Sequence, residues 1–117
     1  MLLYLMKTAN GSRVSLSDIH CGEIWRVKAQ LGFRYVLVVS PDSMNAALTT
    51  ALTIPITTRL KSWPTRMPIK FKKGVRYLLG EQLGSEPIEN FESKVGEVNL
   101  AEMAKVRILL KQMLVES

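Results

Sequence analysis

The side chains that could carry out chemistry in this chain are few. The sequence contains one histidine, His20, and one cysteine, Cys21, so a Ser-His-Asp or Cys-His arrangement would depend on His20 alone. It contains no glycine-rich phosphate loop and no HExxH or DxD pattern for a metal. We therefore expect any enzyme activity to need neither a metal nor an organic cofactor. The groups that remain are arginine, threonine and carboxylate.

These three groups are sufficient for one reaction, the cleavage of RNA through its own 2′-hydroxyl. The nucleophile belongs to the substrate, so the protein has to orient it, stabilise the charge on the phosphorane and move a proton. A guanidinium matches a phosphate with two parallel hydrogen bonds. Arg34 is the first candidate, because it borders an apolar run, where a charge is costly unless it is used. The alternative is a structural pair with Glu23 or Asp42.

Basic residues are concentrated in one part of the chain, and the net charge is +6. Between residues 59 and 76 there is no acid and there are seven bases, namely Arg59, Lys61, Arg66, Lys70, Lys72, Lys73 and Arg76. Trp63 lies in the same span, and charges interleaved with rings suit single-stranded nucleic acid. The candidate RNA-binding residues here are Arg59, Lys61, Trp63 and Arg66. The alternative is a solvated hairpin with Trp63 in the core.

The elements that must position these groups are mostly strands. Alternating or continuous apolar runs predict strands over residues 23–28, 33–40, 48–56, 67–71, 75–79 and 87–91. A turn is expected at Lys72-Lys73-Gly74. Asn99 and Glu102 have the spacing of a capping box, and apolar residues then recur at helical spacing to Met113. The sequence therefore predicts a mainly β fold (β-rich α+β), a small barrel of about five to seven strands with a C-terminal amphipathic helix.

The first twenty residues differ from the rest of the chain. Residues 1–20 have no sustained period, one short strand is expected at Leu2–Leu5, and Asn10-Gly11-Ser12 signals a turn. We interpret them as an extension before one domain, residues 21–117. The apolar start is too short for a signal peptide or a membrane span. With a single cysteine this favours a cytoplasmic protein that does not associate with a membrane.

Five short motifs follow one another in order. They are Gly22-Glu23-Ile24-Trp25, Gly32-Phe33-Arg34-Tyr35 before an apolar strand that ends in Ser40-Pro41, Ile54-Pro55-Ile56-Thr57-Thr58, Glu81-Gln82, and the amphipathic segment Leu100–Leu114. In this order the motifs resemble the MazF/PemK (Kid-like) family, the toxins of type II toxin–antitoxin systems. The resemblance runs from Gly22 to about Leu114, roughly four-fifths of the chain.

The resemblance implies an SH3-like barrel, a homodimer, and a metal-independent, sequence-selective endoribonuclease that cleaves mRNA or other single-stranded RNA. It also implies a cognate antitoxin whose acidic, disordered tail covers the site. Carried over by position, Arg34 would be the catalytic arginine at the scissile phosphate and Thr57 its partner hydroxyl. Glu81 would stand at the place of an active-site aspartate, with Gln82 beside it as a further RNA-binding candidate. For Thr57 and Glu81 the alternatives are a plain strand residue and a structural ion pair.

The chain departs from the family pattern around Arg34. The preceding loop is reduced to Ala29-Gln30-Leu31-Gly32-Phe33 and lacks the family's glutamate and histidine, and Tyr35 replaces a proline. Leu79 stands where PemK-like members have an arginine. The short loop implies either an altered sequence preference or a degenerate toxin that binds RNA or antitoxin without cleavage. A gyrase-inhibiting barrel of the CcdB kind is a third alternative, but the C-terminal residues 114–117 lack its Trp-Gly-Ile-like tail.

Overall fold

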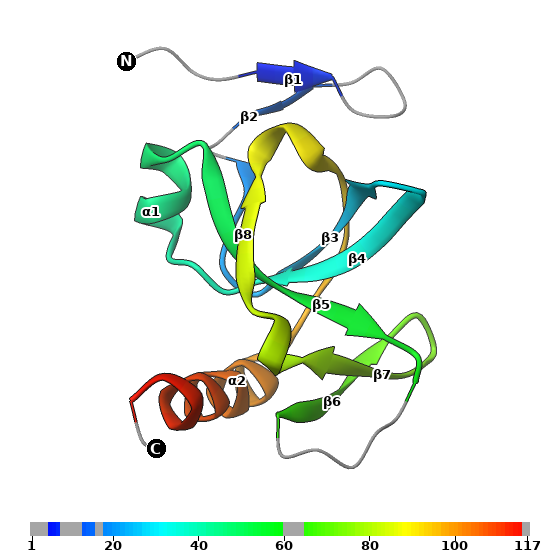
Figure 1. Ribbon diagram of the computed structural model, residues 1–117, viewed down its shortest axis with the longest axis vertical. Helices are drawn as coiled ribbons and strands as arrows, with labels where there is room; N and C mark the ends of the chain where they lie inside the picture. Colours follow the sequence, from blue (N-terminus) through cyan, green and yellow to red (C-terminus); the bar gives the residue numbers. More distant parts are fainter. Residues whose placement is uncertain (1–4, 8–12, 16–17, 60–64, 116–117) are drawn as a thin grey trace.

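A curled antiparallel sheet of seven strands forms the body of the molecule in the computed structural model, which describes residues 5–7, 13–15, 18–59 and 65–115 (Figure 1). The strand order is β6-β7-β5-β4-β3-β9, and β8 pairs with β5 off this path. The strands are β3 (Glu23–Ala29), β4 (Gly32–Val38), β5 (Thr50–Thr57), β6 (Arg66–Phe71), β7 (Gly74–Leu79), β8 (Gly84–Pro87) and β9 (Phe91–Glu97). The mainly β, barrel-like fold with a C-terminal helix is confirmed.

Strand β5 exchanges its partners along its length. Residues 50–53 pair with β8, residues 53–55 pair with β4, and residues 56–57 pair with β7. This strand therefore belongs to both halves of the curled sheet. Two apolar cores are formed, and β3 and β4 contribute residues to both. The first core contains Ile19, Trp25, Val27, Val36, Val38, Ala51, Ile88 and Phe91. Trp25 of the Gly22–Trp25 motif is thus a core residue, 4% exposed.

The second core combines residues of the β6–β7 hairpin and of helix α2 (Leu100–Leu114) with Ile24, Leu37 and Ile54 of β3, β4 and β5. Asn99 accepts a hydrogen bond from the backbone of Glu102, and Glu102 accepts one from the backbone of Asn99, so the predicted capping box is confirmed. Met103 is among the helix residues that enter the core, whereas Leu100, at the first helical position, is 88% exposed. Glu102 also accepts the backbone N–H of Lys70 at 3.0 Å, which fixes the helix start to β6.

The β6–β7 turn forms at the expected place. Phe71 pairs with Gly74, and the two residues between them, Lys72 and Lys73, have φ of 51° and 61°. A two-residue hairpin of this hand requires positive φ at both central positions.

One of the predicted elements is wrong, and another begins later than expected. The strand expected over residues 87–91 does not exist, because Pro87 ends β8, residues 88–90 form the 3-10 turn η3 (Ile88–Asn90), and Phe91 begins β9. The strand expected from Leu48 begins at Thr50, after a short helix, α1 (Asp42–Ala47), that the sequence pattern did not indicate. Helix α1 buries a polar residue, Asn45, which bonds to Ser40 and to the carbonyl of Ile19.

The N-terminal segment forms a separate two-stranded sheet, β1 (Leu5–Lys7) and β2 (Arg13–Ser15), at the end of the molecule opposite α2 (Figure 1). Of the strand predicted at Leu2–Leu5, all but the last residue lies outside the described residues, as does the turn at residues 10–12. Ile19 is buried in the first core, so the segment is anchored where it meets the domain. In the part of the chain that the structure describes, no helix is long and apolar enough to cross a membrane.

An exposed pair ties the start of the domain to α1. His20 Nδ1 lies 3.0 Å from Asp42 Oδ2, and Asp42 Oδ1 accepts the backbone N–H of Cys21 at 2.7 Å. The hydrogen bond to Asp42 raises the pKa of His20. The hydrogen bonds from Cys21 and then His20 lower the pKa of Asp42. The histidine thus has a structural partner on the surface.

This pair predicts a pH-dependent contribution to stability. Because the pKa of His20 is raised in the folded state, its protonation stabilises the fold at pH values below the pKa of the unfolded chain, about 6.5. This stabilisation is lost as the pH rises through the pKa of the folded state. A lowered aspartate pKa stabilises above about 3.9, and that gain is lost as the pH falls. The substitution His20→Gln should therefore lower the urea midpoint more at about pH 5.5 than at about pH 8.5. Equal losses at both pH values would contradict this account.

Candidate active site

A pocket opens where β4 and β5 separate. Their ladder ends at the pair Val36 and Pro55, and the next residues of β5, Ile56 and Thr57, pair with β7 on the other edge of the strand. Continuing the register past this pair would place Arg34 opposite Thr57. A cavity of about 310 Å³ occupies the opening, lined by Phe33, Arg34, Tyr35, Ile56, Thr57, Thr58 and Arg76. Two arginines and no carboxylate lie in this lining.

The shortened loop before Arg34 is a tight hairpin turn. Ala29 of β3 pairs with Gly32 of β4, which leaves Gln30 and Leu31 as the two turn residues. Gly32 has φ of 113°, a conformation that other residues rarely adopt. Leu31 is 99% exposed. The turn is therefore too short to fold back over the pocket, which stays open to a large ligand.

Arg34 is held from behind by a buried carboxylate, Glu86 on β8. Arg34 Nη2 lies 2.6 Å from Glu86 Oε1, and Asn90 Nδ2 donates to Glu86 Oε2 at 2.9 Å. The side chain of Glu86 is 4% exposed, whereas that of Arg34 is 49% exposed. The ion pair fixes one edge of the guanidinium and leaves the remaining N–H donors on the open side.

The partner that the sequence suggested for Arg34 was wrong. Glu23 instead accepts the indole N–H of Trp25 and pairs with Lys94 at 3.1 Å, and Asp42 pairs with His20. Glu86 was missed, because no local pattern distinguishes it from the other glutamates of its segment.

Thr57 lies at the end of β5, where its hydroxyl oxygen accepts the backbone N–H of Arg59 at 3.2 Å. Accepting that bond leaves the hydroxyl hydrogen to be donated to a ligand. The structure thus brings Arg34 and Thr57 to one pocket, whereas Arg59 is exposed and is not part of the lining.

Glu81 lies elsewhere, in the 3-10 turn η2 (Gly80–Gln82) that follows β7. Its two oxygens accept Arg66 Nη2 at 2.7 Å and Arg66 Nε at 3.2 Å, and Thr65 donates to it at 2.8 Å. Burial works against its ionised form, but the hydrogen bonds from Thr65 and Arg66 outweigh that cost and keep the pKa of Glu81 below its ordinary value. Glu81 and Arg66 are therefore joined to each other and do not line the pocket of Arg34.

The structure describes only one of the three remaining RNA-binding candidates. Gln82 is exposed in η2, on the same turn as Glu81. Lys61 and Trp63 lie outside the described residues. Among the described residues no three His, Cys, Asp or Glu side chains converge as a metal site would require.

The turn that carries Glu81 depends on Gly80. The backbone N–H of Gly80 donates to the carbonyl oxygen of Thr65 at 3.0 Å. A Cβ added at Gly80 would lie 2.6 Å from that oxygen. Because the obstacle is backbone, Gly80→Ala should lower the free energy of unfolding by about 1–3 kcal/mol, measured by urea titration. The matched control is Gly84→Ala, whose Cβ would come no closer than 3.9 Å. Equal midpoints for the two variants would contradict the prediction.

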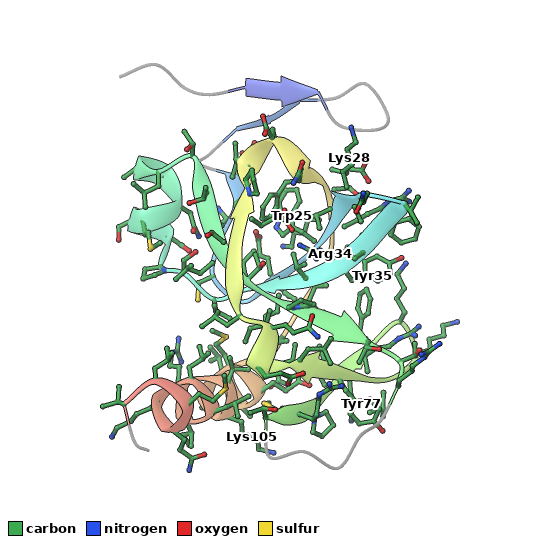
Figure 2. All side chains as sticks on the ribbon, viewed as in Figure 1. Trp25, Lys28, Arg34, Tyr35, Tyr77 and Lys105 are labelled. Carbon is green, nitrogen blue, oxygen red and sulfur yellow. The ribbon has the colours of Figure 1, made fainter. Side chains whose placement is uncertain are left out.

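An aromatic and cationic row borders the pocket on the other side of β4 from Arg34. The rings of Phe33, Tyr35 and Phe71 meet edge to face, with centroids 5.3 Å and 5.1 Å apart. Arg26 lies 3.9 Å over the Phe33 ring, and Lys72 Nζ donates to the Tyr35 hydroxyl at 2.8 Å. Phe33 is 45% exposed. Figure 2 shows Arg34 and Tyr35 on opposite sides of the β4 ribbon.

Residues 20–114 match the family described as PemK-like, MazF-like toxin of type II toxin-antitoxin system. The chain belongs to this family. A search of curated proteins finds no match.

Solved structures of MazF-like toxins share the fold. An endoribonuclease in complex with its cognate antitoxin, from a mycobacterial species, superposes with a TM-score of 0.75 at 21% identity over 82% of this chain and 94% of that one. MazE–MazF (Form-II) from Deinococcus radiodurans gives 0.72 at 23% identity over 85% and 97%. The Mycobacterium tuberculosis toxin MazF-mt6 gives 0.69 at 15% identity over 77% and 93%. At these identities the likeness is one of fold.

Within this MazF-like frame, Tyr35 has a role that a proline could not have. Its ring packs on Phe71 and its hydroxyl accepts from Lys72, both of the β6–β7 hairpin. Tyr35 therefore connects β4 to that hairpin across the opening in which the pocket lies.

Proposed function

We propose that this toxin is a metal-independent endoribonuclease that cleaves single-stranded RNA through the 2′-hydroxyl. The observation that carries the proposal is the half-exposed guanidinium of Arg34, anchored on buried Glu86 and placed with Thr57 in an open pocket without a lining carboxylate. Such a site attracts a phosphodiester and leaves its donors free to bind it.

The reaction follows from these groups. The 2′-oxygen attacks the phosphorus, a bond from 2′-oxygen to phosphorus forms, and the bond to the 5′-oxygen breaks. The products are a 2′,3′-cyclic phosphate and a 5′-hydroxyl. The proton that the 2′-oxygen loses is balanced by the proton that the 5′-oxygen gains. Arg34 stabilises the charge that grows on the non-bridging oxygens, and Thr57 donates a hydrogen bond to the same phosphate. Both side chains act by position and charge, since an arginine is too weak an acid to lose its proton.

Single-stranded RNA suits the surroundings of the pocket better than a duplex. Exposed Phe33 and its neighbour Tyr35 offer ring surfaces, and Arg26 and Lys72 supply charge beside them. Unpaired bases stack on such rings while cations follow the phosphates.

The test uses the purified protein and a long RNA, in the presence of a chelator such as EDTA. We expect cleavage at a limited set of sequences, with 2′,3′-cyclic phosphate and 5′-hydroxyl ends found by end-specific ligation. Ends of the opposite type, or cleavage that requires an added metal, would contradict the proposed mechanism. Growth arrest on induced expression is the matching cellular result.

A degenerate toxin is the second candidate, and the two-residue β3–β4 turn favours it. That turn supplies no acid or histidine to the pocket, whose lining offers no other proton acceptor of that kind. Salt-sensitive RNA binding without any new RNA ends would establish this candidate over the first.

We also propose that a cognate antitoxin covers the site with an acidic segment. The net charge of +6 and the two arginines of the pocket complement such a segment. Four of the similar structures are complexes of this kind, an endoribonuclease with its cognate antitoxin and three forms of MazE–MazF. We further propose a homodimer, for which the exposed apolar residues Leu100 and Ile108 on α2 offer contact area. Because the substrate would be mRNA, we propose that this toxin acts in the cytoplasm.

A further inference from the structure

We propose that Arg76 forms a second phosphate subsite and binds the RNA phosphate next to the one held by Arg34. This inference rests on the proposed RNA substrate. Arg76 lies on β7 and lines the same pocket as Arg34 and Thr57, although the sequence motifs gave it no role.

The two arginines reach the pocket from different sides. Strands β4 and β7 flank β5, so Arg34 and Arg76 stand two strands apart. Residues two apart on a strand share a face. Arg34 therefore shares a face with Val36 of the first core, and Arg76 shares one with Leu78 of the second core. Guanidiniums that enter one opening from two faces are placed to hold two successive phosphates.

Of the two arginines that line the pocket, Arg76 is the one without a carboxylate partner among the described residues. Arg34 is neutralised by Glu86, whereas Arg76 forms no ion pair with any carboxylate that the structure describes. Its Nε is buried and has no hydrogen-bond partner among the described residues. A buried donor without an acceptor is unfavourable, and a turn of the guanidinium toward the pocket would give this donor a phosphate oxygen as its acceptor. A phosphodiester also fits the planar arginine fork.

A purely structural role explains Arg76 less well. On β6 the residue opposite it is buried Ile69, and on β7 the next residue of the same face is buried Leu78. An aliphatic side chain would complete this row without the cost of an unpaired charge. The arginine is consistent with an anion that arrives from outside.

The experiment separates binding from cleavage. An oligoribonucleotide with one 2′-deoxy residue at the mapped cleavage site cannot react, so its Kd is measured at several salt concentrations. We expect Arg76→Met to raise Kd about tenfold and to reduce the slope of log Kd against log salt by about 0.7, the value for one phosphate on a single strand. The control Lys70→Met removes a charge from an exposed position on the same hairpin, in the groove beside α2, and should leave both values unchanged. Arg76→Lys should keep the slope.

A scan with single methylphosphonate linkages locates the contact. In the wild-type protein, neutralising the linkage beside the scissile one should weaken binding, and in Arg76→Met the same change should have no further effect. On cleavable RNA, Arg76→Met should raise KM and leave kcat within about threefold. A drop in kcat at unchanged KM, or an unchanged Kd in a folded Arg76→Met, would overturn the subsite. Failure of the wild-type protein to bind RNA would instead overturn the proposed function as well.

Discussion

Replacing Arg34 with alanine should slow RNA cleavage by about 10²–10³-fold, the usual effect of removing one group that stabilises transition-state charge. The guanidinium of Arg34 is fixed by Glu86 and faces the pocket with its remaining donors. Its bond to the phosphate strengthens as charge grows on the non-bridging oxygens, so kcat falls more than affinity does. Single-turnover cleavage of a short RNA, with Kd for its uncleavable form measured in parallel, gives both quantities.

Two controls accompany this measurement. Lys105→Met removes a charge from the exposed side of α2, far from the pocket (Figure 2), and should cleave at the wild-type rate. Arg34→Lys keeps the charge but loses the fork, so it should recover only part of the rate. Cleavage at the full rate by a folded Arg34→Ala variant would remove Arg34 from the mechanism.

The Arg34–Glu86 pair should be strongly asymmetric in its effect on stability. Arg34→Met leaves the 4% exposed carboxylate of Glu86 without its charged partner, and this should lower the free energy of unfolding by about 3 kcal/mol. Glu86→Gln leaves the guanidinium of Arg34 half exposed to water and keeps an acceptor for Asn90. It should therefore lower the free energy of unfolding by only about 1 kcal/mol. Urea unfolding of both single variants measures the difference.

The double variant Arg34→Met/Glu86→Gln completes the cycle. It should be more stable than Arg34→Met alone, because the buried charge is gone. If the losses in the free energy of unfolding were additive, the buried carboxylate of Glu86 would be stabilised by water or by a group other than Arg34. The Glu86→Gln background also serves the kinetic test, since Arg34→Ala should slow cleavage there by about 10²–10³-fold without leaving a buried unpaired carboxylate.

The elements that the sequence predicted well are those with local signals. The capping box of Asn99 and Glu102 lies within one turn, and the Lys72-Lys73 turn is bounded by apolar residues on both sides. Helix α1 gave no such signal, because its stability comes from hydrogen bonds of buried Asn45 to the chain around it. The strand expected at residues 87–91 was wrong because residues 88–90 form a 3-10 turn between β8 and β9.

The candidate site was predictable only in part. Arg34 and Thr57 lie in motifs whose order is informative, and the structure places them in one pocket. Glu86 lies 52 residues from Arg34, so only tertiary structure reveals the pair. Arg76 was one of seven bases in its span. Glu81 was expected beside Arg34, but β7 carries it away from the pocket to Arg66.

The exchange of partners along β5 couples the two halves of the site mechanically. Arg34 is carried by the half that contains β3 and β4, whereas Arg76 is carried by the hairpin that packs on α2. Of the strands that the structure describes, β5 is the one that pairs both with β4 and with β7. A substitution that loosens α2 could therefore alter the spacing of the two guanidiniums without touching either one. We expect the β5 amides to show the slowest hydrogen exchange and the hairpin amides to exchange faster, so that the opening of the hairpin sets the width of the RNA path.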